Sequence, residues 1–172
     1  MRRVLALLVL LLPSTAAALS QPRQGPYVDV SGGLSAELLP TALGPEWGLS
    51  AGWWWGEYDD VYALGRYTAL GLTLRQAWVA GGLRTLPQVE VRRGTDVLVV
   101  GYHAFLSAGP ELGERGLGAV ALIGGGAKMR FTPHVGLGVR VAAGVSWVDS
   151  DLHPRAHPGL YLEWSRPTGG SR

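Results

Sequence analysis

The sequence contains no cysteine, and beyond residue 12 it has no apolar run long enough for a membrane-spanning helix. Disulfide bonds therefore cannot hold the chain together. Once the first residues are set aside, there is also no excess of charge of one sign. Without Arg2 and Arg3, thirteen basic residues stand against thirteen acidic ones. The basic pI of the whole chain thus gives no reason to expect nucleic acid as a partner.

The first nineteen residues have the pattern of a secretory signal peptide. Arg2 and Arg3 precede an apolar run over residues 4–12, which ends at Pro13 and is followed by the small residues Ala16, Ala17 and Ala18. We expect residues 1–19 to be cleaved, residues 20–166 to form one domain and residues 167–172 to be a short tail. An exported chain without disulfides must be held by its own core or by a membrane.

Alternation of period two indicates β-strands over most of the remaining chain. The clearest case is "HVGLGVRVAAGVSW", residues 134–147, where one parity is wholly apolar. This segment is longer than the usual strand of a soluble sheet and suits a tilted strand that crosses a bilayer, which needs ~9–11 residues. Similar segments cover residues 27–36, 47–56, 96–106, 116–131 and 159–165. Residues 61–92 have room for two more strands, with a connection around residues 75–82; a short helix over residues 72–80 is the alternative there.

The connections between these segments differ in length. We expect long loops at "ELLPTALGPE", "SAGPELGERG" and "VDSDLHPRAHP", the last of which would leave Arg155 in water, and a further long loop between the two strands of residues 61–92. We expect short turns at "GEYDD", "RRGTD" and "TPH". Short turns at one end and long loops at the other are the plan of an outer-membrane barrel.

Aromatic residues on the apolar parity fall into two groups. In this arrangement Trp47 and Trp147 lie at the long-loop end, and the short-turn end carries Trp53, Trp55, Phe131 and Trp164. Two such belts are what the interfaces of a bilayer favour. A soluble barrel would instead spread its tryptophans through one core.

On this pattern the chain resembles the small outer-membrane β-barrel proteins, the class that includes the transmembrane domain of outer membrane protein A. The last strand, "HPGLYLEW", is similar to the assembly signal of that class at His157, Gly159, Leu162 and Trp164, although "SRPTGGSR" follows where the class often stops. The resemblance implies an all-β, closed, antiparallel up-and-down barrel of about eight strands in the outer membrane. It also implies a monomer whose partners are outer-membrane lipid and the barrel-assembly machinery, with no cofactor.

Charged residues collect on the glycine-rich parity, which would face the lumen. They form an expected lumen cluster of Asp29, Arg140 and Glu163, with Lys128 and Arg130 as further members. Such a cluster could plug a narrow lumen with salt bridges or line a gated, porin-like pore. Gly138 has the same parity, and serine is expected to be tolerated there.

Histidines raise the question of catalysis or metal binding. His103 and Ser107 share one face of a strand but are too far apart along it for a hydrogen bond. His153 and His157 are expected in a solvated loop. We therefore predict no catalytic residue and no metal ligand, and a structural or narrow-pore barrel. The alternative is a soluble, exported, lipocalin-like barrel that binds a small apolar ligand.

Overall fold

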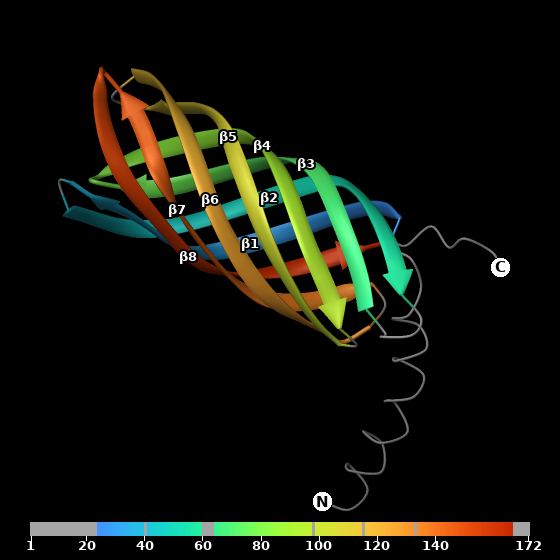
Figure 1. The fold of residues 1–172 in the computed structure, drawn as a ribbon. Helices are drawn as coiled ribbons and strands as arrows, with labels where there is room; N and C mark the ends of the chain where they lie inside the picture. The colour runs from blue at the N-terminus through green and yellow to red at the C-terminus, as the bar shows by residue number, and fades with distance from the viewer. Residues whose placement is uncertain are drawn as a thin grey trace, which may run out of the picture.

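The computed structural model describes residues 24–39, 41–59, 64–97, 99–114, 116–132 and 134–166. Within these ranges eight antiparallel strands close into one barrel, in which β8 pairs with β1 (Figure 1). The strands are β1 (Gly25–Leu38), β2 (Thr41–Asp59), β3 (Leu64–Val79), β4 (Gly82–Val97), β5 (Val100–Gly113), β6 (Gly116–Arg130), β7 (Val135–Val148) and β8 (Asp151–Ser165). The predicted closed up-and-down barrel is confirmed. The expected signal peptide, residues 1–19, and the tail, residues 167–172, lie outside the described residues.

The strand register determines how wide the barrel is. Register partners followed once around from Tyr27 lead to Arg155 on β8 and then to Glu37 on β1, ten residues beyond the start. Strands in such a barrel tilt by roughly 35–45° from the axis, and eight of them leave an interior that side chains can fill. The lumen is therefore narrow enough to act as a core.

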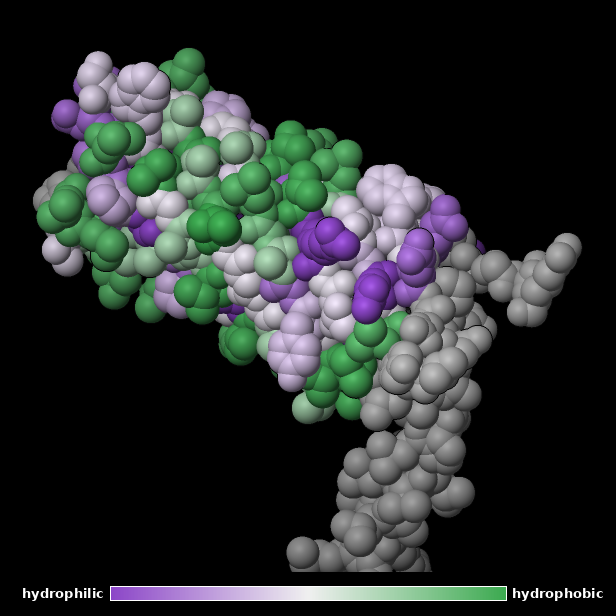
Figure 2. All heavy atoms as spheres, in the orientation of Figure 1, coloured by the Kyte–Doolittle hydropathy of each residue, from purple (hydrophilic) through white to green (hydrophobic). Residues whose placement is uncertain are grey.

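The two faces of the strands are inverted relative to a soluble barrel. On β7, Leu137, Val139 and Val141 are exposed, whereas Arg140 is buried. The predicted inward and outward faces are confirmed in the same way for residues 27–36, 47–56, 102–106, 116–131 and 134–147. Figure 2 shows hydrophobic residues over much of the outer wall. No helix in the described part of the chain is long and apolar enough to cross a membrane.

The connections do not follow the expected alternation of long and short. At the end of the barrel where β1 ends and β2 begins, called here the hairpin end, two residues separate the strands of each of the pairs β1–β2, β3–β4, β5–β6 and β7–β8. In the two fully described turns, residues 80–81 and 149–150, both residues have positive φ, as in type I′ hairpins. The opposite end, where β1 starts and β8 ends, is called the terminal end; there β2 ends at Asp59, β4 at Val97 and β6 at Arg130.

The expectation of long loops was wrong because those segments continue the strand pairing. Leu34 pairs with Pro45, Gly113 with Gly116, and Val148 with Asp151. Residues 61–92 contribute to β3 and β4, which a two-residue turn joins, and the alternative helix over residues 72–80 is absent. The strands, of 14 to 19 residues, are longer than the ~9–11 that a bilayer requires.

Inward aromatic rings lie against glycines of neighbouring strands. A Cβ added to Gly138 would meet the ring of Tyr161, and one at Gly124 would meet the ring of Phe105. The expectation that Gly138 tolerates serine was therefore wrong, because the space beside this backbone is already filled by Tyr161. The glycine-rich parity makes room for aromatic and charged side chains in a narrow lumen.

Replacing Gly138 by alanine should destabilise the barrel by about 1–3 kcal/mol, the usual cost of overpacking a filled interior. Gly32 is the matched control, because an added Cβ there meets no atom within 4 Å. Urea unfolding of Gly138→Ala and Gly32→Ala in lipid vesicles, followed by tryptophan fluorescence, measures the difference. Equal unfolding midpoints would show that Tyr161 moves aside without cost.

Candidate functional site: the charged interior

The interior of the barrel is lined by ionisable side chains that are almost completely buried. The buried acids are Asp29, Glu37, Glu90, Asp96, Glu111 and Glu163, and the buried bases are Arg75, Arg84, Arg92, Lys128, Arg130, Arg140 and Arg155. Burial of an isolated charge in a dry interior is costly, so each charge needs a partner. The charged interior therefore depends for its stability on the ion pairs described next.

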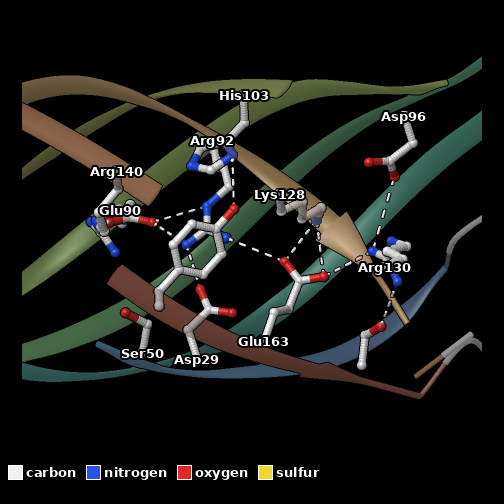
Figure 3. Close-up of polar contacts among 12 residues, drawn as sticks. Asp29, Ser50, Glu90, Arg92, Asp96, His103, Lys128, Arg130, Arg140 and Glu163 are labelled. Atoms are coloured by element: carbon white, nitrogen blue, oxygen red, sulfur yellow. Dashed lines mark hydrogen bonds and ion pairs between the residues drawn. The ribbon is translucent and has the colours of Figure 1, made fainter. Parts of the chain in front are cut away.

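One cluster of ion pairs lies toward the terminal end (Figure 3). Glu163 on β8 accepts hydrogen bonds from Lys128 Nζ at 2.7 Å and from Arg130 Nη2 at 2.8 Å, both donors on β6. Arg92 on β4 donates to Asp29 Oδ2 on β1 at 2.6 Å. These bonds cross the lumen between strands that are not neighbours, so they connect distant walls of the barrel.

Glu90 on β4 joins this cluster to the middle of the lumen. Its Oε1 accepts a hydrogen bond from Arg92 at 2.7 Å, and its Oε2 accepts one from Arg140 on β7 at 3.1 Å. Arg75 Nη2 lies 3.7 Å from Glu90 Oε2 and also reaches Glu46 through Nη1, at 3.2 Å. His157 on β8 contacts Glu46 as well. One carboxylate thus contacts three arginines from three strands.

A second cluster lies toward the hairpin end. Arg84 on β4 bridges Glu37 at 2.8 Å and Glu111 at 3.0 Å, and Arg155 on β8 donates to the same Glu111 at 2.6 Å. The expectation that Arg155 lies in a wet loop was wrong, because β8 begins at Asp151 and the alternation carries Arg155 inward. Its guanidinium is as deeply buried as that of Arg92.

Aromatic rings complete the packing between the charges. Trp54 lies edge-on between Tyr27 and Tyr67, with ring centroids 4.8 and 4.3 Å away. Lys128 Nζ lies 4.5 Å from the centroid of Trp54, and the Arg140 guanidinium lies 4.5 Å from that of Phe105. Such cation–π contacts favour a cation that is held out of water.

All five residues of the expected lumen cluster point into the barrel. Lys128 and Arg130 both contact Glu163, which also lies 3.7 Å from Arg92, and Arg92 in turn bonds Asp29. Arg140 lies nearer the middle of the lumen, and Glu90 links it to Arg92 and so to the rest of the cluster. The sequence alone did not predict the lumen residues on β3 and β4 or those in the segments expected to be loops. The signal that could have identified many of them is the alternation of polar with apolar residues, which continues through residues 84–92 and 151–163.

The outward aromatics lie toward both ends of the barrel. Trp55, Phe131 and Trp164 lie at the terminal end, while Trp147 is one residue from the hairpin end of β7. On β2, Trp53 lies three residues to the terminal side of the middle residue, Ser50, and Trp47 lies three residues to its hairpin side. Trp78 at the hairpin end and Tyr102 at the terminal end are also exposed.

The histidines are placed as parts of the lumen or its rim. Ser107 donates to Gln88 at 3.2 Å, while His103 contacts the Tyr161 hydroxyl at 3.5 Å, so these two residues do not form a catalytic pair. His153 lies on β8 beside Glu37 rather than in a solvated loop. Within the described ranges, no group of three or more histidine, aspartate or glutamate side chains is arranged to hold a metal ion.

A closed eight-stranded barrel with an apolar outer wall and an ion-paired interior has the architecture of the small outer-membrane β-barrels. Its fold is similar to that of Neisserial surface protein A, with a TM-score of 0.53 and 14% identity over 83% of this chain and 97% of that one. The outer membrane enzyme PagL aligns with a TM-score of 0.49 and 16% identity, covering 79% of this chain and 98% of that chain. No family model and no curated protein sequence matches the chain.

Replacing Glu163 by glutamine should destabilise the barrel by about 3–5 kcal/mol, because Lys128 and Arg130 would lose their shared counter-ion inside a dry lumen. Glu57→Gln on the outer wall is the matched control and should leave the stability nearly unchanged. Urea unfolding in lipid vesicles compares the two variants. A Glu163→Gln midpoint equal to that of the control would mean that water screens the cluster.

Proposed function

We propose that the protein is an integral outer-membrane β-barrel of structural type whose own side chains close its lumen. The observation that carries this proposal is the inversion of the two faces: large apolar residues are exposed around the barrel while arginines, lysine and carboxylates are buried inside it. In water the outer wall would be one continuous apolar patch, far larger than soluble monomers expose. Within a bilayer the same wall is in its favoured solvent.

The inversion opposes the alternative of a soluble, lipocalin-like barrel. A binder of small apolar ligands needs an apolar cavity and a wettable exterior. Here the interior holds Glu90, Arg92 and Arg140, and the exterior holds Leu72, Ile123 and Leu160. The arrangement is the reverse of what that function requires.

The ion pairs support a closed lumen rather than a pore. The terminal-side cluster joins β1, β4, β6 and β8, and the hairpin-side cluster joins β1, β4, β5 and β8, so charged side chains span the barrel at two levels. A solute would have to break several short ion pairs to pass. We propose that the barrel conducts little until this network is disrupted.

The remaining expectations stand as parts of the same proposal. The protein would have no enzymatic activity, bind no nucleic acid and function as a monomer surrounded by outer-membrane lipid. Its last strand, with Leu162 and Trp164 facing outward and His157 facing inward, would serve as the signal that the barrel-assembly machinery recognises.

A charge on the outer wall should cost stability according to its depth. Val141→Arg, at the middle of β7, is expected to lose ~2–4 kcal/mol, because the guanidinium would lie near the bilayer midplane. Leu152→Arg, paired with Trp147 at the hairpin end, should lose only about 0–1 kcal/mol. Both side chains face outward, so unfolding in vesicles isolates the effect of depth. Equal and small effects, or a wild-type protein that stays soluble without detergent, would contradict the membrane location.

Planar-bilayer recording tests the closed lumen. Wild-type protein should show little conductance, whereas Glu90→Ala should open an anion-preferring path, because the three arginines that contact Glu90 would repel one another. Glu57→Ala on the outer wall should remain closed. Steady conductance from the wild-type protein would contradict the closed lumen while leaving the membrane location intact.

A further inference from the structure

The outer wall carries two arginines at the terminal end of strands β3 and β4. Arg66 and Arg93 are exposed and line a hollow of about 420 Å³ together with Trp55, Glu57 and Thr68. Figure 2 shows hydrophilic side chains gathered at this end of the molecule, beside the hydrophobic wall. The hollow faces outward, so its charges do not belong to the network in the lumen.

The two arginines are placed to hold one ligand. Thr68 pairs with Arg93 and lies two residues from Arg66, so the arginines are diagonal neighbours on one face, with Cα atoms roughly 7–8 Å apart. Glu57 pairs with Arg66 across β2 and β3, so one carboxylate lies beside the two arginines on this face. The residues that line the hollow thus carry two positive charges against one negative charge. Two long guanidinium side chains at that spacing can contact the oxygens of a single phosphate.

The depth of the arginines in the wall indicates where that phosphate would come from. Trp55 pairs with Thr68, in the same row as Arg93, and belongs to the outward aromatics of the terminal end. Tryptophan prefers the depth of lipid headgroups. Cations at this depth are stabilised by anionic lipid.

A second hollow lies on the same wall nearer the middle of the bilayer, beyond the outward row of Trp53, Leu70 and Val91. It has a volume of about 390 Å³, and the outward side chains along it include Leu49, Ala51, Leu72, Val89, Ala108 and Pro110. Pro87 and Pro110 lie where the pairing of β4 and β5 is interrupted, between Thr85–Leu112 and Val89–Ala108. Leu72 follows Thr68 by four residues of β3, about 13 Å along the strand.

We propose that the two hollows form one binding site for an anionic glycerophospholipid of the leaflet at the terminal end. Arg66 and Arg93 would bind its phosphate, and the apolar groove above them would take an acyl chain. The inference rests on the proposed membrane location, because the occupant is a bilayer lipid. This occupant is favoured by the charge complementarity at headgroup depth and by the apolar groove nearer the middle of the bilayer, which lies on the same three strands and on β5.

Native mass spectrometry of the detergent-solubilised full chain tests the site, with phosphatidylglycerol and phosphatidylcholine of identical chains offered in equal amounts. Wild-type protein should retain phosphatidylglycerol preferentially. Arg66→Gln/Arg93→Gln should lower that retention at least about tenfold, since each arginine near anionic lipid contributes roughly a fivefold effect. Arg166→Gln, an exposed arginine just after β8, is the control and should retain the lipid like wild type.

A second set of variants separates the groove from the phosphate site. Ala108→Phe, which fills the apolar groove from an exposed position, should lower the retention of both lipids, and glycerol phosphate without acyl chains should fail to compete. Equal retention of the two lipids by wild-type protein, or unchanged retention by the double arginine variant, would overturn the site. Flotation with liposomes distinguishes the two proposals: protein that does not float contradicts the membrane location, and protein that floats without lipid preference contradicts only the lipid site.

Discussion

The pairing of buried charges inside a narrow barrel is the interaction on which the rest of the structure depends. Eight strands with a ten-residue offset enclose a narrow space. Because the apolar parity faces outward, the polar parity of every strand points into that space. Those charges are tolerable only when they meet opposite charges from other strands, as Glu90 meets arginines of β3, β4 and β7. The same bonds that satisfy the charges connect distant walls of the barrel.

Glycines on the inward face provide the space that this interior requires. Rings such as Tyr161 and Phe105 extend across the lumen because Gly138 and Gly124 leave space against the neighbouring backbone. The glycines thus allow bulky side chains to share a small lumen with many ion pairs. The apolar outward face and the inward face of glycine, charged and aromatic residues therefore depend on each other.

The alternation of residues was sufficient to predict the barrel, its outward parity and the inward direction of Asp29, Arg140 and Glu163. It did not predict the hairpin end, because proline and glycine in residues 37–46, 107–116 and 148–158 were interpreted as loop signals. In the barrel, Pro45 and Pro158 occupy strand positions, and tight turns with positive φ need only two residues. Glu37, Glu111 and Arg155 were missed with those segments. Which charges meet could not be predicted either, since partners such as Arg92 and Asp29 depend on the register around the whole barrel.

Closure between β1 and β8 has a consequence for how the chain folds. These strands come from opposite ends of the barrel sequence, so their pairing closes the longest loop of the fold. Contacts between residues so distant in the sequence carry a large loop-closure entropy cost, and this cost slows folding. Until the seam closes, both edge strands present unpaired backbone groups, and the partly folded sheet can pair with another copy. The time for which this edge stays open therefore sets how strongly the chain depends on protection during its insertion.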